Sequence, residues 1–571
     1  MLNVNVVKGR HNIRAGTDVN YQAQNHAQPE ITGGDSFGAR GGFRFRSGPT
    51  QLEGGPAGNQ YNAFASFLLG LPDQIGRLKL VEPYTTRNKQ YSVYIRDQWQ
   101  PHAKVTISYG TRWEYFPIPT RAHRGLERYD VNTNTMIVGG VGVVPKDLGV
   151  HVSRTLFAPR LSITYRPTHR TVLRAGFGVT NDPYALARPL RTNHPGVLNL
   201  LLQAPNSLAF VSHLSDGIPA IPDPDLGNGI IAVPGAITVL TLPDTFVRGQ
   251  IRSWNVAMQR ELRWGFVGEA AYVGTRQIDQ LGFRELNWSP IGGGQAGRQL
   301  NEKFGRTGQT RLVAPIGNSQ YDALQTRLDR RFANGIHVGV NYTFSKSIGI
   351  AGNPNSDGAL RINIPEYYAL NRSLSDFDRT HALNITNITE LPFGPNRRWL
   401  NDGKVLSQIV SGWQVNNILS FYSGTPFSVT ASGTSLNAPE NDQRADQVTR
   451  KVAILGGIGS TNPYFDPLAF APVTQARFGT ASFNSVRGPG VKSWDLGVFR
   501  RVQLPRQMDL QFRVEAFNVT NTPRFSNPNG NVSNLRLNPD GTIRDLNGYA
   551  VITSTQDGSE RQVRVGVRLG W

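Results

Sequence analysis

Apolar and polar residues alternate most clearly at the C-terminal end of the chain. Every second position there is apolar, at Val563, Val565, Val567, Leu569 and Trp571. The positions between them hold Gln, Arg and Gly. A period of two residues predicts a β-strand with one apolar and one polar face. By itself this pattern fits the closing strand of a membrane barrel and the edge strand of a soluble sheet equally well.

The alternation recurs upstream in pairs of segments that are joined by short turns. Residues 105–115 place mainly apolar and aromatic side chains on one face and small or charged ones on the other. Segment 91–99 precedes them across the turn 100–103, so the two segments form a predicted hairpin. Further hairpins are predicted at residues 161–179, 254–275 and 324–344, with turns at 166–170, 263–265 and 332–335.

Short turns alternate with much longer connections, such as residues 180–248 and 427–494. Transmembrane barrels have this arrangement, with long loops outside the cell and aromatic residues at the strand ends. Soluble sandwiches rarely carry loops of such length. The pattern therefore predicts an all-β protein, an antiparallel transmembrane β-barrel with roughly sixteen strands. We expect residues 1–571 to form this one domain and to lie in the cell outer membrane.

The amino-acid composition excludes several classes of protein and of functional site. The absence of Cys excludes disulfide scaffolds, thiolate metal sites and cysteine nucleophiles. No stretch is long and apolar enough for a membrane helix, and the start of the chain has no signal-peptide pattern. The net charge is +20, and Arg supplies 50 of the 60 basic residues. Because these arginines are spread over alternating strands and form no continuous stripe, the charge does not predict nucleic-acid binding.

Five residues on polar faces are candidate substrate-binding residues, namely Arg96, Arg112, Glu114, Arg174 and His337. If the polar faces point inward, these side chains line the lumen, where they attract an anionic solute or contact a plug. An ordinary solvated barrel interior is the alternative interpretation. Basic loops are also expected to meet the phosphates of outer-leaflet glycolipid, so outer-membrane lipid and glycolipid are predicted partners.

Three short motifs resemble enzyme or ion sites but lack the surroundings that those sites need. Residues 34–38 match a hydrolase nucleophile elbow, yet Pro and Gly flank them where a strand and a helix are required. Residues 292–297 match a dinucleotide fingerprint without a βαβ unit. Residues 130–134 begin like a calcium loop, but Thr135 and Val141 stand where Gly and Glu belong. We therefore expect no enzyme activity, no cofactor and no metal site.

Twelve short motifs follow one another over most of the chain. They are residues 259–262 (QREL), 269–276 (EAAYVGTR), 321–325 (YDALQ), 330–335 (RRFANG), 342–347 (YTFSKS), 375–379 (SDFDR), 390–394 (ELPFG), 412–414 (GWQ), 423–427 (SGTPF), 487–490 (RGPG), 515–518 (EAFN) and 525–528 (FSNP). Each motif is weak alone, but in this order and number they resemble the Oar-like group of TonB-dependent outer-membrane receptors.

This resemblance implies a barrel of about twenty-two strands that is filled by an N-terminal plug, with a TonB box for coupling to the inner-membrane energy complex. Residues 11–21 already resemble a barrel strand, so we expect the signal peptide, TonB box, plug and first strands to be missing here. The TonB complex is then a partner only where the plug is present. Because an open sheet edge is costly in lipid, we predict that the strand near Ile13 pairs with the strand that ends at Trp571.

The first functional interpretation is an outer-membrane receptor barrel that takes up an unidentified solute, energised through TonB in the full-length family. A passive porin or a surface adhesin is the second interpretation, and a secreted soluble β-protein or enzyme is the third. The strand from Val563 to Trp571 is also interpreted as an insertion signal that the barrel assembly machinery reads.

Overall fold

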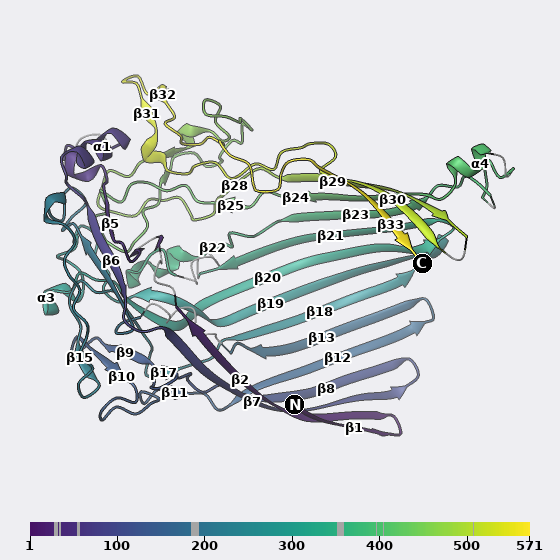
Figure 1. Cartoon of the computed structure of the whole chain (residues 1–571), viewed down its shortest axis with the longest axis horizontal. Helices are drawn as coiled ribbons and strands as arrows, with labels where there is room; N and C mark the ends of the chain where they lie inside the picture. The colour runs from purple at the N-terminus through teal and green to yellow at the C-terminus, as the bar shows by residue number, and fades with distance from the viewer. Residues whose placement is uncertain are drawn as a thin grey trace.

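The computed structural model describes residues 1–27, 32–33, 36–53, 58–183, 193–350, 359–395, 397–402, 405–505 and 508–571. One sheet of seventeen strands dominates the molecule. Its strands run side by side, with short turns at one end and long connections at the other (Figure 1). The predicted all-β class and the expected number of strands are both confirmed.

The fifteen longer strands of this sheet pair antiparallel in chain order. They are β1 (Leu2–Lys8), β2 (His11–His26), β7 (Tyr84–His102), β8 (Val105–Tyr115), β12 (Leu156–Thr168), β13 (Thr171–Asn181), β18 (Gln250–Glu261), β19 (Phe266–Glu285), β20 (Thr310–Ala333), β21 (Ile336–Gly349), β23 (His381–Glu390), β24 (Trp413–Tyr422), β29 (Val491–Gln503), β30 (Asp509–Phe517) and β33 (Gln562–Gly570). The short strands β16 (Val239–Thr241) and β22 (Ser373–Leu374) join at the edges of β20 and β21.

Strand register aligns the apolar residues of neighbouring strands into one continuous face. Ile107 lies opposite Ile163, and Val514 lies opposite Val565. Side chains on this face are exposed, and Val565 keeps 77% of its surface accessible. A slip of one residue would move every side chain of a strand to the other face of the sheet. The separation of apolar and polar side chains between the two faces therefore fixes the register. The apolar face is therefore a band that protein does not cover.

Three of the four predicted turns are tighter than expected, and the fourth, predicted at 263–265, spans residues 262–265. The hairpin between β7 and β8 turns at residues 103–104, because β7 continues to His102. The hairpin between β12 and β13 turns at 169–170, and that between β20 and β21 at 334–335. Left-handed backbone at Asn334 and Gly335 suits a two-residue hairpin turn. The connection from β23 to β24 is the exception at this end, since residues 391–412 include the helix α4 (Val405–Val410).

The predicted pairing of the Ile13 strand with the Trp571 strand is wrong. Ile13 lies in β2, opposite Val6 of β1 on one side and Asp97 of β7 on the other. The first residues of the chain form β1, which already occupies that edge of β2. In the part of the chain that the structure describes, β1 pairs only with β2, and β33 pairs only with β30. The sheet consequently has two open edges.

The long connections pack into a cap at the end of the strands opposite the turns (Figure 1). The cap holds the buried core of the molecule, in four apolar clusters that include Leu126, Phe246, Phe465 and Tyr549. Small sheets add to it, such as β5 (Gly42–Arg44), β6 (Gln74–Leu80) and β14 (Val197–Gln203). Within the described residues no helix is long and apolar enough to cross a bilayer.

Candidate functional site

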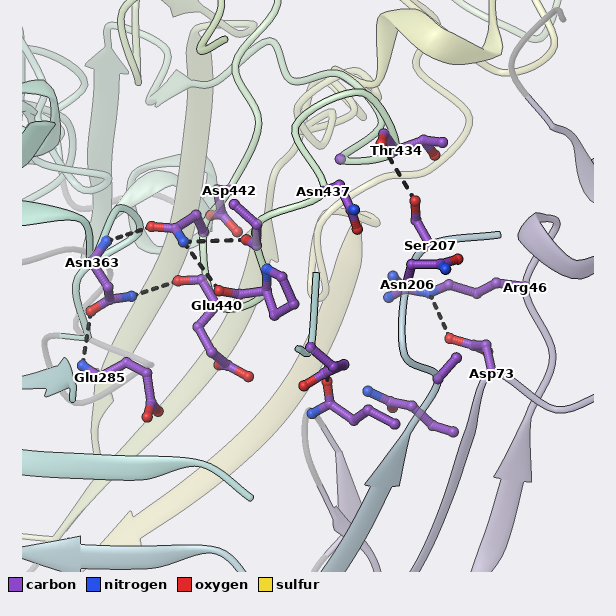
Figure 2. Close-up of a pocket in the computed structure, with 18 of the residues that line it drawn as sticks. Arg46, Asp73, Asn206, Ser207, Glu285, Asn363, Thr434, Asn437, Glu440 and Asp442 are labelled. Atoms are coloured by element: carbon purple, nitrogen blue, oxygen red, sulfur yellow. Dashed lines mark hydrogen bonds and ion pairs between the residues drawn. The ribbon is translucent and has the colours of Figure 1, made fainter. Parts of the chain in front are cut away.

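A polar cavity of about 670 Å³ lies within the cap (Figure 2). Eight parts of the chain meet there, namely residues 44–48, 73–74 and 203–207, the end of β19, Gln295, the start of β20, residues 359–363 and residues 432–442. Four arginines and four carboxylates line it, together with Asn, Gln, Ser and Thr side chains. Its volume is typical of small-molecule sites, but most such sites are lined by apolar groups. The lining therefore suits a hydrophilic ligand.

Glu285 ends β19 and is the most buried acid of the cavity, with 3% of its surface exposed. Its Oε1 accepts hydrogen bonds from the backbone N–H groups of Asn287, at 2.8 Å, and Thr310, at 2.7 Å. Its Oε2 accepts no hydrogen bond from the described residues. Burial, reinforced by the charge of Glu440, raises the pKa of Glu285 to about 7. This carboxyl can therefore exchange a proton near neutral pH.

Glu440 faces Glu285 from the loop 432–442. Its carboxylate accepts hydrogen bonds from Arg298 Nη2 and Gln309 Nε2, both at 2.9 Å. Its backbone is left-handed, with φ 67°, a conformation that non-glycine residues rarely adopt. The ion pair with the buried Arg298 offsets the cost of burying both charges. Glu440 is thus a fixed acceptor at the cavity wall.

Asn363 connects the two carboxylate residues through their backbones. Its Oδ1 accepts a hydrogen bond from the Glu285 N–H at 2.9 Å, and its Nδ2 donates to the Glu440 carbonyl at 2.6 Å. A third bond runs from the Asn363 N–H to Asn441 Oδ1 at 2.8 Å. Figure 2 shows this chain of hydrogen bonds on one side of the cavity. One amide side chain therefore connects the end of β19 to the loop 432–442.

The opposite side of the cavity comes from the N-terminal part of the cap. Arg44 Nη2 donates to Asp73 at 2.6 Å, and Arg46 lies 3.9 Å from the same carboxylate. Ser207 Oγ donates to the Thr434 carbonyl at 3.4 Å. Figure 2 shows Arg46, Asp73 and Asn206 together on this side. Donors and acceptors thus face each other across the cavity.

Three of the candidate residues from the sequence lie together elsewhere. Arg96, Arg112 and Glu114 line a hollow of about 950 Å³ on the polar face of the sheet, which is therefore the concave face. Arg112 pairs with Asp18 and with Glu114, each at 2.9 Å. Arg96 has no ion pair within the described residues. It stays available to an anionic group in the hollow.

The other two candidates lie outside this hollow. Arg174, on β13, pairs with Glu269 of β19 at 3.2 Å. His337 begins the polar face of β21, and its Nε2 lies 3.7 Å from Asp329. Each therefore has a carboxylate partner within the large sheet. The apolar residues of β33 remain exposed beside the open edge of the sheet.

Sequence reasoning missed the cap cavity completely. Glu285, Asn363 and Glu440 are widely separated in sequence and belong to no recognisable motif. Glu285 is the last residue of a long strand, and this position is the one signal that the sequence offers. Residues 292–297 lie in a cap loop, and residues 130–134 form the end of a short cap strand and the turn after it. Gly34 and Asp35 of the elbow-like motif lie outside the described residues.

Comparison with known proteins places this architecture among membrane proteins. A family model described as "Outer membrane beta barrel domain" matches residues 1–564. No curated protein is similar enough to count as a match. Among solved structures, the FrpB iron transporter (F3-3 variant) from Neisseria meningitidis is 11% identical with a TM-score of 0.42, over 99% of this chain and 53% of that one.

Two further solved structures are similar to the same degree. The ferric enterobactin receptor PfeA from Pseudomonas aeruginosa is 11% identical, with a TM-score of 0.45, over 99% of this chain and 52% of that one. The ferric citrate transporter FecA is 10% identical, with a TM-score of 0.39, over 100% of this chain and 53% of that one. The chain thus spans about half the length of the structures that it matches.

Proposed function

The chain belongs to the outer membrane β-barrel domain family, and on that premise we propose that it works as an uptake receptor for a polar solute. It resides in the outer membrane of a Gram-negative cell. Short turns of such barrels face the periplasm and long loops face outward. The cap cavity would then be the first binding site that a solute meets. The proposal includes no catalytic step.

The polar cavity at the ends of β19 and β20 is the observation that carries the proposal. Glu285 and Arg311 line this cavity and also belong to β19 and β20 of the large sheet. We propose that a solute leaving the cap cavity passes along the concave polar face of these strands. We propose that Arg96 and Arg112 in the hollow of that face attract its anionic groups, with Glu114 orienting Arg112.

TonB is the proposed energy source, because the motifs of the chain resemble the Oar-like TonB-dependent receptors. The lining of the cavity favours a solute that carries both hydrogen-bond donors and acceptors. A passive porin is the second candidate, since the unpaired Arg96 faces a hollow large enough for water and small anions. A receptor needs energy for accumulation and a porin does not, so energy dependence separates the two.

Medium-depletion profiling tests the proposal even though the solute is unidentified. Cells that express the complete natural polypeptide are grown in a mixed medium, and mass spectrometry follows which polar solutes disappear. We expect depletion of a restricted set of solutes that stops when TonB is deleted. Asn363→Ala breaks the connection between the Glu285 and Glu440 backbones. It should reduce the depletion of these solutes at least tenfold, because the geometry of the binding site is lost.

Arg450→Gln is the matched control for this experiment, because Arg450 is an exposed cap residue outside the cavity. It should leave depletion unchanged. Depletion that persists without TonB would support the porin instead. If no solute is depleted at normal surface expression, uptake is contradicted and a binding role of the cap becomes the better account.

A further inference from the structure

Five successive hairpins carry exposed basic residues at their short turns. We call the set the turn belt, and it consists of Arg10, Lys104, Arg166, Arg170, Arg263 and Arg331. The connections β1–β2, β7–β8, β12–β13 and β18–β19 hold Arg10, Lys104, Arg170 and Arg263, whereas Arg166 and Arg331 lie two residues before the ends of β12 and β20. These hairpins lie next to one another in the sheet. The turn belt is therefore a row of cations along one end of the strands.

Contacts between neighbouring turns hold the row together without neutralising it. Arg10 donates to the Pro101 carbonyl, and Lys104 Nζ donates to the Pro167 carbonyl at 3.2 Å. Carbonyl groups carry no net charge, and no carboxylate of the described residues forms an ion pair with any of the six belt residues. Glu261, beside Arg263, offsets one charge at most. The turn belt thus keeps most of its positive charge.

Several arginines of the cap, in contrast, form ion pairs with carboxylates. Arg44 pairs with Asp73 at 2.6 Å, Arg477 with Asp446 at 2.6 Å, and Arg298 with Glu440 at 2.9 Å. These three cap charges are therefore compensated within the cap. The six belt residues have no such carboxylate partner among the residues that the structure describes, and they contribute to the net charge of +20. A continuous row of such cations favours a partner with negative charge at the turn end.

The apolar face leads directly into the turn belt. Trp264 lies in the β18–β19 turn with 83% of its surface exposed, and Phe332 and Tyr165 are exposed near the neighbouring turns. The sequence from apolar band through aromatic residues to cations matches the layers of a lipid leaflet, which are hydrocarbon, interface and phosphate. A soluble partner would not require the aromatic layer.

We propose that the turn belt binds the phosphate groups of anionic phospholipids in the leaflet that borders the short turns. Short turns of outer-membrane barrels face the periplasm, so this is the periplasmic leaflet. Several guanidinium and ammonium groups in a row suit repeated phosphates, because each phosphate accepts more than one hydrogen bond from Arg. The proposal concerns anchoring in the membrane and stands whether or not the chain transports a solute.

Lipid selectivity in reconstituted vesicles tests this inference. The full chain is placed in phosphatidylcholine vesicles that contain spin-labelled phosphatidylglycerol or spin-labelled phosphatidylcholine, and electron paramagnetic resonance gives the ratio of their association constants. We expect a preference for phosphatidylglycerol of roughly fivefold at low salt. The quadruple variant Arg10→Gln, Lys104→Gln, Arg166→Gln and Arg170→Gln should bring the ratio close to one.

A matched variant removes four positive charges from the cap surface, at Lys146, Arg450, Lys451 and Arg544, each changed to Gln. It should keep the preference of the unchanged chain. Raising NaCl to about 1 M should also reduce the preference of the unchanged chain, which tests the inference even if the quadruple variant does not fold. A ratio near one in the unchanged chain, a preference that survives in the folded quadruple variant, or an equal loss in the cap variant would overturn the proposal.

Discussion

Glu285 illustrates how one buried side chain makes a loop cavity sensitive to pH. Two backbone N–H groups fix its Oε1, while burial raises its pKa to about 7 from an ordinary value near 4.5. The folded cap therefore holds a proton that the opened cap would release between pH 4.5 and 7. Its contribution to stability is complete below about pH 4.5 and is lost as the pH rises through 7. Opening of the cap becomes easier in mildly alkaline medium.

Replacing Glu285→Gln should remove this dependence, because Gln keeps a carbonyl acceptor but cannot ionise. Hydrogen exchange of the peptides that contain Asn287 and Thr310, corrected for intrinsic exchange rates, measures opening of the cap. In the unchanged chain we expect protection to fall between pH 5 and pH 8 by an amount on the order of 3 kcal/mol. Protection in the variant should stay level, and an equal fall in both proteins would contradict the role of Glu285.

At the scale of elements, the sequence predicted the strands because their side chains have a period of two. The sequence predicts the hairpins around residues 103–104 and 334–335 correctly, although their turns are shorter in the structure than expected. The pairing partner of Ile13 was not predicted, because β1 has only seven residues and offers a short periodic pattern. Periodicity identifies a strand but does not identify the strand beside it.

The last strand offers a test at this scale. Trp571 follows β33 at the end of the apolar face and is 94% exposed. Trp571→Asp places a charge where an aromatic residue would meet the bilayer interface, so it should reduce assembly in the outer membrane severalfold. Heat-modifiable migration of extracted membranes on gels measures the assembled fraction. Trp571→Phe keeps the aromatic ring and should assemble normally, and equal assembly of the Asp variant would refute the insertion role.

For the whole molecule, the large sheet and the cap are encoded in the sequence in different ways. Local periodicity specifies the strands of the sheet. The cap cavity depends on contacts between residues far apart in the chain, such as Asn363 and Glu440. No local signal marks such pairs, since their side chains become neighbours only after the long connections pack around their apolar clusters. Arg96, Arg112 and Glu114 were predictable as a group because strand register alone brings them to one polar face.

The central claim is that one face of the large sheet contacts lipid and the other contacts water. The accessibility of spin labels on β12 to lipid-soluble and water-soluble reagents tests this claim most directly. The chain has no Cys, so a single introduced Cys can be spin-labelled without background. The substitutions Leu161→Cys and Ile163→Cys probe the apolar face, and Arg160→Cys and Ser162→Cys probe the polar one. We predict that labels at 161 and 163 collide mainly with oxygen dissolved in lipid, and labels at 160 and 162 mainly with an aqueous nickel complex. Equal aqueous access at all four positions in membrane-embedded protein would contradict the account.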